Sequence, residues 1–478
     1  GASDATEDFA NRVDYTYGAQ TVDPTFAGTN LQGRPASVST GTPYQRGGRI
    51  DELYSYNVAG AVLRKRMRIT RGMSIVTKDI DYTYDAEGKL LSIKYPDERK
   101  PFVTTYDAMA RPNGLTQDYR YGEWNGEELW ATRQWVSGVN YGVAGELLGI
   151  SIYAGNFGSA ASERRFTETR EYNERMQMTR QRATYGSLGS SGTFDPVALD
   201  LRYVFTTPSS PINDGRILQR DNIVSGETVT YTYDALQRLE KAETASAAWG
   251  LSWDYDGFGN RWEQRVTKGA APPNNVSFDL ATNRVNAPGY AHDANGNMTA
   301  MPGYHNLTYD IDNRLLSANG NRSSEQYAYL ADNKRVWKQT NQNGNPVEHY
   351  YLYGVGGERI ATYTVHQQML NEGTLFLAAN QNTIDVYFGG RLIWQNGKAV
   401  LRDRLGSVMA RAGDYTALER HDYFPYGEER TPTLGDRNKF GTYHRDQTGL
   451  DYADQRYYNS AIGSFLSADP YEDSGGAT

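Results

Sequence analysis

The stretch DYTYDAEGKLLSI, residues 81–93, decides the fold of this 478-residue chain. It alternates aromatic and polar residues, is interrupted by the turn signal DAEG at residues 85–88, and then alternates again. Asp85 can accept a hydrogen bond from the backbone two residues on and so open a type I turn. Gly88 can take the left-handed conformation that a bulged hairpin needs. The stretch therefore predicts one β-hairpin.

The same pattern recurs along the chain, which predicts an array of hairpins. Further copies begin at Tyr54, Thr104, Thr169, Val229, Leu251, Leu307 and Gln326. The residue that restarts the strand stands six positions after the Tyr, at Val62, Leu90, Met178, Leu239 and Leu315. We expect the aromatic side chains of successive hairpins to lie on one side of the sheet. The alternative is an ordinary antiparallel β-sandwich in which Tyr-Asp dipeptides recur by chance.

Composition agrees with an all-β chain that has a thin core. The 37 Tyr exceed the 14 Phe, and tyrosine suits a half-buried sheet face because its ring packs while its hydroxyl stays wet. The net charge of -8 comes without a basic run, so nucleic acid is not an expected partner. The absence of cysteine excludes disulfides, thiolate catalysis and cysteine-ligated zinc.

Membrane and targeting segments are not expected either. No window approaches the roughly 18 continuous apolar residues that a spanning helix needs. The opening GASDATEDFA has neither a basic leader nor an apolar core, so we expect no signal peptide in it.

Four motifs occur in order between Val400 and Pro470. They read DRLGSV (403–408), ERHDYFPYG (419–427), KFGTYHRDQTGLDYADQRYYNSAIG (439–463) and GSFLSADP (463–470). This segment closely resembles the core-associated segment of the RHS (rearrangement hotspot), or YD-repeat, family, and with the upstream copies the resemblance covers most of the chain.

The resemblance implies an all-β fold in which a spiral ribbon of antiparallel hairpins curls into a shell or partial barrel. We expect an N-terminal extension with a first strand at 1–25, the YD-repeat shell at 26–397, the core segment at 398–470 and a truncated tail at 471–478. Structural roles in the core segment are expected for Asp403, Gly406, Tyr423, Tyr426, Gly427, Gly449, Tyr457, Tyr458 and Gly463.

The length of the ribbon limits what the chain can enclose. Roughly 38 strands at ~4.8 Å each give a ribbon about 180 Å long, or a ring about 58 Å across if it closes in one turn. Two turns would be about 29 Å across and would leave no room for even a small folded domain. We therefore expect an open curved section of one turn or less.

In the RHS family the core segment is associated with self-cleavage that resembles aspartyl proteolysis, in which paired carboxylates act as base and acid. The resemblance assigns the first aspartate to Asp469 and a supporting arginine to Arg456. The second aspartate would lie downstream of the chain's last residues, so we expect no cleavage by this chain alone. In the alternative reading Asp469 belongs to an extended turn before Pro470, and Arg456 only holds the core segment against the shell.

Other chemistries lack their motifs. The histidines never stand four apart, and HExxH, GxSxG and phosphate-loop patterns are absent, so no metal or cofactor is expected. Asp446 and Asp451 are expected to form a turn around Gly449.

The main functional hypothesis is a shell module of a secreted or cell-surface bacterial toxin that sequesters or presents a C-terminal effector. The alternative is a glycan-binding module that uses exposed aromatic residues such as Trp124, Trp130, Trp253 and Trp394. A third reading is an enzyme that cleaves only itself. Unpaired end strands would also favour edge-to-edge self-association.

Overall fold

The computed structural model describes residues 12–154, 164–187, 196–321, 323–342, 345–366, 377, 382–413, 417–433, 435 and 437–470. In these ranges every regular element is a β-strand, and within each sheet every strand pairs antiparallel with the next along the chain. The predicted all-β fold is confirmed. No helix in the described part of the chain could cross a membrane.

The outer sheet holds the first nineteen strands. They are β1 (Val13–Tyr17), β2 (Pro35–Thr40), β3 (Arg49–Tyr56), β4 (Val62–Arg71), β5 (Ser74–Tyr84), β6 (Leu90–Lys94), β7 (Phe102–Tyr106), β8 (Pro112–Trp124), β9 (Glu127–Tyr141), β10 (Leu147–Tyr153), β11 (Arg164–Tyr172), β12 (Met178–Ser187), β13 (Val197–Val204), β14 (Gln219–Asn222), β15 (Glu227–Tyr233), β16 (Leu239–Thr244), β17 (Trp249–Tyr255), β18 (Arg261–Gly269) and β19 (Asn274–Asn275).

Two short pairs lead to the inner sheet. The pairs are β20 (Phe278–Asp279) with β21 (Arg284–Val285), and β22 (Ala291–His292) with β23 (Met298–Ala300). The inner sheet is β24 (Tyr304–Tyr309), β25 (Leu315–Gly320), β26 (Ser324–Tyr329), β27 (Arg335–Gln342), β28 (Asn345–Tyr353), β29 (Arg359–His366), β30 (Asn382–Phe388), β31 (Arg391–Gln395), β32 (Lys398–Arg402), β33 (Val408–Ala412) and β34 (Glu419–Arg420).

The core sheet is the last and smallest of the large units. It comprises β35 (Arg437–Asn438), β36 (His444–Arg445), β37 (Asp451–Ala453), β38 (Arg456–Asn459) and β39 (Ser464–Phe465). The expected boundary at residue 398 falls between β31 and β32, which share the inner sheet, and the change of sheet lies between β34 and β35. The expected tail at 471–478 lies outside the described residues.

The hairpins form as the repeat pattern predicts. Tyr84 pairs with Leu90, six residues on, across a register shift next to the Tyr. The Asp85 carboxylate accepts from the backbone N–H groups of Glu87 at 3.1 Å and Lys89 at 2.8 Å, and Gly88 has a φ of 86°. Side-chain capping and the left-handed residue therefore fix the turn, and the turn fixes the register.

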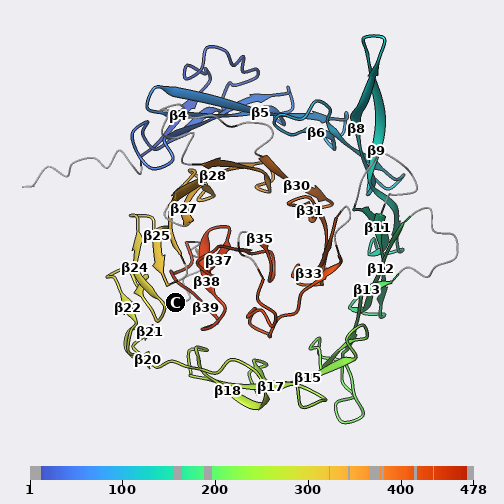
Figure 1. Cartoon of the computed structure of the whole chain (residues 1–478), viewed down its shortest axis with the longest axis vertical. Coiled ribbons are helices and arrows are strands. Elements are labelled where there is room, and N and C mark those ends of the chain that lie inside the picture. The colour runs from blue at the N-terminus through green and yellow to red at the C-terminus, as the bar shows by residue number, and fades with distance from the viewer. Residues whose placement is uncertain are drawn as a thin grey trace, which may run out of the picture.

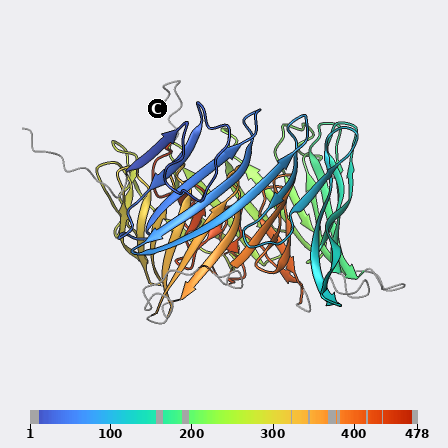
Figure 2. The ribbon, with the colours of Figure 1, turned by 90° about the horizontal axis from the view of Figure 1, so that it is seen from above.

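The ribbon winds past one full turn, so the inner sheet lies inside part of the outer sheet (Figure 1). Direct contacts join residues far apart in sequence: the Tyr350 hydroxyl donates to the Gly47 carbonyl at 3.2 Å, and Lys65 Nζ donates to the Tyr353 carbonyl at 3.2 Å. Arg71 of the outer sheet also pairs with Glu348 of the inner sheet. Figure 2 shows the strands of both layers running between two rims.

One hydrophobic core lies between the two layers. Outer residues such as Phe102 and Trp135 are buried in the same cluster as the inner residues Trp337, Tyr350 and Leu352. The expected open section of one turn or less is therefore wrong. Each layer is too thin to bury its own aromatic face, and nesting the turns removes both faces from water.

The core sheet lies inside the spiral, against the inner sheet (Figure 1). Leu450, Tyr452 and Tyr457 share a buried cluster with Tyr327 and Tyr329 of β26. The chain's own C-terminal segment therefore occupies the space that the inner turn surrounds.

Candidate functional site

Arg456 and Asp469, which the resemblance assigns to self-cleavage, lie together in the structure. Arg456 is the first residue of β38, and its Nη2 donates to Asp469 Oδ2 at 2.7 Å. The guanidinium also lies over the ring of Phe465, with its central carbon 3.8 Å from the ring centroid. Because Phe465 ends β39, which pairs with β38, the core sheet itself holds the arginine in place.

This pair supplies one positioned carboxylate at the surface. The side chain of Asp469 is 52% exposed and that of Arg456 is 21% exposed, so water can reach the carboxyl group. Aspartyl chemistry needs a second carboxylate of complementary protonation state, and the family resemblance implies that this residue lies downstream of Asp469. The structure brings the predicted pair together, and its catalytic role stays a prediction.

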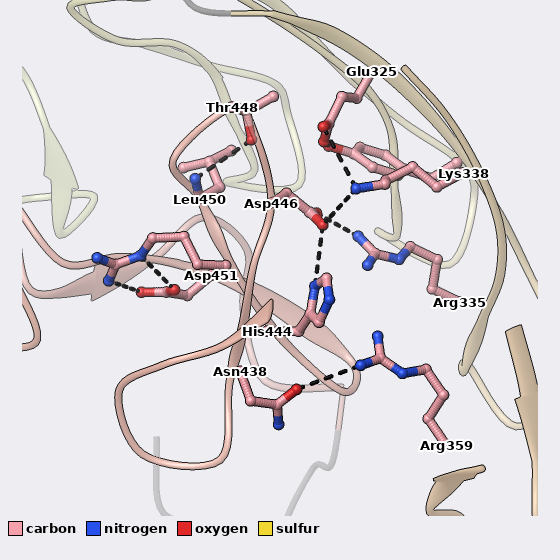
Figure 3. Close-up of polar contacts among 12 residues, drawn as sticks. Glu325, Arg335, Lys338, Arg359, Asn438, His444, Asp446, Thr448, Leu450 and Asp451 are labelled. Carbon is pink, nitrogen blue, oxygen red and sulfur yellow. Dashed lines mark hydrogen bonds and ion pairs between the residues drawn. The ribbon is translucent and has the colours of Figure 1, made fainter. Parts of the chain in front are cut away.

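A second group of charges, the docking cluster, fixes the same segment to the inner sheet. It consists of Asp446 and His444 from the core segment with Arg335 and Lys338 from β27 (Figure 3). Asp446 pairs with Arg335, and Lys338 Nζ lies 3.1 Å from Asp446 Oδ1. The side chains of Asp446, Arg335 and Lys338 are at most 1% exposed, so this ion pair is fully withdrawn from water.

Arg335 is also surrounded by tyrosines. Its guanidinium lies 4.3 Å from the ring centroid of Tyr452, and its Nη1 donates to the Tyr457 hydroxyl at 2.6 Å. Burial alone would raise the pKa of Asp446, but the charges of Arg335 and Lys338 outweigh it and hold that pKa well below its usual value. The Asp446 carboxylate therefore stays ionised and serves as an anchor rather than as a proton donor.

Asp446 both forms a turn through its backbone and docks the core segment through its carboxylate. Its backbone forms the expected turn, with Gly449 N–H donating to the Asp446 carbonyl at 3.1 Å. Its carboxylate, however, pairs with Arg335 and Lys338 of β27, whereas the carboxylate of Asp85 caps its own turn. Asp451 pairs with Arg445 through two hydrogen bonds of 2.8 and 2.6 Å. Both aspartates therefore hold the segment through ion pairs.

Arg261 of the outer sheet makes a third contact with the C-terminal part. Its Nη2 donates to the Ala461 carbonyl at 2.7 Å, and its guanidinium lies 4.2 Å from the Tyr426 ring centroid. The nearby Glu428 accepts from the Gln264 amide at 3.2 Å. Burial raises the pKa of Glu428 to about 7, although the charge of Arg261 opposes the shift.

Sequence reasoning missed Arg261, Arg335 and Arg359, which all occupy the same repeat position. Each stands six residues after a Tyr and pairs with it across the turn, where the other repeats carry an apolar residue. Arg359 contacts the core segment as well, through Asn438 Oδ1 at 3.4 Å. The signal was present in the sequence: an arginine at an apolar repeat position marks a hairpin against which another segment docks.

The expected structural residues of the core segment are placed as turns and packing contacts. The Asp403 carboxylate accepts from the N–H groups of Leu405 at 2.9 Å and Ser407 at 2.8 Å. Positive φ angles occur at Gly406, Gly427, Gly449 and Gly463. Buried tyrosines, with hydroxyl bonds to backbone or to Arg335, are Tyr423, Tyr457 and Tyr458. Tyr426 stacks edge-on against Trp253, with ring centroids 5.4 Å apart.

The aromatic residues expected to meet glycans are mostly not available. Trp253 is only 2% exposed, and Trp394 packs edge-on against Trp135 at 5.2 Å. The ring of Trp130 is covered by Lys100, whose Nζ lies 4.6 Å from its centroid. Only Trp124 of the four is strongly exposed, at 70%. The expectation that Trp253 is exposed is therefore wrong, because its strand turns that side chain toward the C-terminal segment.

The described residues contain no group of three or more acidic or histidine side chains that could hold a metal ion. A cavity of about 600 Å³ lies between the outer sheet, the inner sheet and the core segment and is lined by Phe102, Tyr387, Arg402 and His444 among others. It is smaller than any folded domain of about 100 residues.

No protein-family model matches the chain. The tRNA3(Ser)-specific nuclease WapA of Bacillus spizizenii is 29% identical over 255 residues, which are 50% of this chain and 10% of that protein. The toxin subunit YenC2 of Yersinia entomophaga is 23% identical over 282 residues, which are 52% of this chain and 27% of that subunit. The chain thus spans about a tenth and about a quarter of these relatives' lengths.

Solved structures with the same fold come from Tc toxin complexes. The TcdB2-TccC3 chain solved with Cdc42 superposes with a TM-score of 0.67 at 18% identity, covering 94% of this chain and 23% of its own. A second structure of TcdB2-TccC3 gives 0.67 over 96% of this chain. At this identity the likeness shows the fold. Taken with the repeats, the core motifs and the sequence relatives, it supports the resemblance of this chain to the RHS, or YD-repeat, family.

Proposed function

We propose that this chain is one section of the β-shell of a bacterial toxin and that it holds the segment leading to a C-terminal effector. The observation that carries the proposal is the position of the core sheet, which lies inside the spiral although it comes last in the chain (Figure 1). A segment that follows the core sheet would begin inside the wall. The toxin relatives and the Tc toxin fold support the same role.

The section sequesters cargo only together with more shell. The inner turn surrounds the core sheet, and the cavity of about 600 Å³ between the layers is far too small for a folded domain. The relatives are four to ten times longer than the matched part. In this proposal the remaining shell encloses the effector. The core sheet of the present section fills the inside of the inner turn and acts as a plug. A secreted or cell-surface location follows from that role.

Limited proteolysis of the longer protein tests this plug role. Breaking the docking cluster with Asp446→Asn should loosen the core segment and make the effector region accessible to trypsin at an early stage. The control is Tyr121→Phe, since Tyr121 is 59% exposed on the β8–β9 hairpin. Equal resistance of the effector region in both variants would show that the core segment does not control its enclosure.

Self-cleavage is the second part of the proposal. Arg456 holds Asp469 at 2.7 Å, and a downstream aspartate would complete the carboxylate pair that activates water. The intact mass of the longer protein should reveal two fragments, and its Asp469→Asn variant should stay whole. If both stay whole while folded, the Arg456–Asp469 pair is structural.

One observation favours glycan binding as another candidate. The β8–β9 hairpin projects beyond the rest of the wall (Figure 1), and Trp124 and Tyr121 near its tip are 70% and 59% exposed. Titration with a glycan panel should then quench tryptophan fluorescence in the parent but not in Trp124→Ala. Absence of saturable quenching by every glycan in the panel would remove this candidate.

A further inference from the structure

The cavity between the two layers and the core segment has the size of a small-molecule site. We call it the seam cavity; Tyr95, Phe102, Tyr387, Arg402 and His444 line it together with other residues. Its volume of about 600 Å³ falls within the range of about 300 to 1,000 Å³ that is usual for ligand pockets. Much of its lining is apolar and includes Leu90, Ile93, Phe102, Leu115, Val386 and Phe388.

The seam cavity reaches the surface at one end. Its lining includes Gly356, Gly389 and Gly390, which are exposed. A Cβ at Gly390 would have no described atom within 4 Å, so there is free space at this part of the mouth. A small molecule can therefore enter from the solvent.

Arg402 stands where repeats such as 81–93 carry a tyrosine. It directly precedes Asp403, which caps the turn, and it pairs with the residue six positions on. Tyr106, at the same position of an earlier repeat, donates its hydroxyl to a carbonyl of the preceding hairpin. The Nε of Arg402 donates instead to the carbonyl of Gly406 in its own turn, at 2.7 Å. The role of this guanidinium is therefore not the joining of hairpins.

The guanidinium of Arg402 is a buried charge without a counterion. The residue is only 8% exposed. Among the described residues no carboxylate lies within ion-pair distance of it, and its Nη atoms have no hydrogen-bond acceptor. Burial, and to a lesser extent the charge of Arg391, lower the pKa of Arg402. Because a buried charge without a partner is costly, this arrangement is typical of a binding site.

Two tyrosine hydroxyls in the same lining are also without a partner. Tyr95 is 3% exposed and Tyr387 is half-buried, and neither hydroxyl forms a hydrogen bond within the described part of the chain. Burial raises the pKa of both hydroxyls, and the charge of Arg402 opposes the shift at Tyr387. Both hydroxyls therefore stay protonated, and Tyr387 lies near the guanidinium of Arg402.

The other lysine and arginine side chains of the lining are already paired. Arg359 pairs with Asp385 at 2.9 Å, and Lys334 pairs with Asp454 at 2.9 Å. Of the described side chains that line the seam cavity, Arg402 is therefore the one permanent cation left for a ligand.

We propose that the seam cavity binds a small monocarboxylate with an apolar body, whose carboxylate accepts hydrogen bonds from Arg402 and from the hydroxyls of Tyr95 and Tyr387. All three groups are donors, and a carboxylate can accept from several donors at once. The apolar lining covers the rest of the molecule. A phosphate monoester fits less well, because its second negative charge would meet Glu358 and Asp454, which line the same cavity.

Saturation-transfer NMR with 3-phenylpropanoate, beside its neutral amide, tests the proposal. The parent should bind the carboxylate saturably and the amide about tenfold or more weakly, because the amide offers no charge to Arg402. Arg402→Gln should weaken carboxylate binding by about tenfold or more and remove the preference over the amide. The matched control is Arg404→Gln. Arg404 is exposed and lies over the ring of Tyr203, outside the cavity, so its loss should leave binding unchanged.

Tyr387→Phe is the second variant, since it removes a hydroxyl that has no partner in the described structure and so should keep the fold. It should weaken carboxylate binding about threefold or more, and circular dichroism checks that each variant is folded. Four results would overturn the proposal. They are no saturable binding of 3-phenylpropanoate, benzoate or octanoate by the parent, which would mean that the cavity holds water only; equal binding of acid and amide; equal effects of Arg402→Gln and Arg404→Gln; and unchanged binding by folded Tyr387→Phe.

Discussion

Tyr106 shows what the tyrosine of each repeat contributes. Its hydroxyl donates to the carbonyl of Leu90, the first residue after the preceding turn, at 2.6 Å. The ammonium of Lys89 lies 5.7 Å from its ring centroid. The next residue, Asp107, caps the following turn through the N–H groups of Met109 and Arg111. The dipeptide therefore joins one hairpin to the next while it shapes its own turn.

Removing this hydroxyl tests the link between hairpins. Tyr106→Phe leaves the half-buried Leu90 carbonyl without its 2.6 Å donor, so the free energy of unfolding should fall by about 1 kcal/mol. Urea unfolding followed by circular dichroism measures the change. Tyr121→Phe, on an exposed strand end, should change the free energy by less than about 0.5 kcal/mol. An equal effect of both substitutions would contradict this role.

Gln237 occupies a turn position whose left-handed backbone conformation favours glycine. It has a φ of 66°, while Gly259, at the same place in the next turn, has a φ of 88°. A left-handed residue with a side chain costs about 1 kcal/mol relative to glycine. Gln237→Gly should therefore raise the free energy of unfolding by up to about 1 kcal/mol, and Gly259→Gln should lower it by about 1 to 2 kcal/mol.

Chemical denaturation of the two variants gives the result directly. Neither side chain at these positions meets a packed neighbour, since a Cβ at Gly259 would have no atom within 4 Å and Gln237 is exposed. Changes of the same sign in both variants would show that the backbone angle does not control stability at this position.

At the scale of the elements, buried ion pairs hold the core sheet against the inner sheet, because no strand pairing joins the two sheets. Asp446 meets Arg335 and Lys338 with almost no exposure to water. Asp446→Asn would leave the buried Arg335 without its carboxylate partner, while Lys338 keeps Glu325 at 3.6 Å, so unfolding should become easier by about 3 kcal/mol. Adding Arg335→Met should recover part of that loss, because the uncompensated charge is then removed.

A double-variant cycle in urea measures this coupling. The two single variants and the pair should be non-additive, with a coupling energy of at least about 1 kcal/mol. Additive losses would mean that the two residues stabilise the core sheet independently, in contradiction to the docking cluster.

The contact at Glu428 gives the docked segment a dependence on pH. Burial raises the pKa of Glu428 to about 7, so this residue contributes stability below its unfolded pKa of about 4.3 and loses it as pH rises through 7. Glu428→Gln should be more stable than the parent at pH 8, by about 2 kcal/mol, and equal to it near pH 4. Thermal unfolding at both pH values measures the difference.

The stability contributed by His444 changes with pH in the opposite direction to that contributed by Glu428. The pH profile of the parent alone therefore does not separate the two residues. Burial and the charge of Arg359 lower the pKa of His444 to about 3, so its contribution is present above about pH 6.5 and is lost as pH falls toward 3. Between about pH 4.5 and 6.5 the loss of stability at Glu428 with rising pH is offset by the gain of stability at His444. A pH profile of Glu428→Gln that equals the parent's would contradict the assigned burial of Glu428.

At the scale of the whole molecule, local chemistry predicted the hairpins but not how the turns nest. The rule that Tyr84 pairs with Leu90 follows from one turn and could be read from the sequence. The position of Arg456 beside Asp469 followed from the family motif. The contact of Gly47 with Tyr350 joins two turns of the spiral, and no local pattern specifies it. It arises because two aromatic faces are buried together.

The same distinction applies to the docking cluster. Asp446 was correctly expected in a turn, since turn chemistry is local. Its partners Arg335 and Lys338 lie about a hundred residues earlier, and they could be found only by asking why an arginine replaces an apolar residue in that repeat.

The central claim is that the core sheet, β35 to β39, lies inside the spiral. Amide hydrogen exchange followed by mass spectrometry tests it most directly. If the core sheet is enclosed, the amides of β36 to β38 should stay protected as long as those of β3 and β4 in the outer sheet, despite their place near the end of the chain. Exchange of β36 to β38 within seconds, with β3 and β4 still protected, would contradict the account.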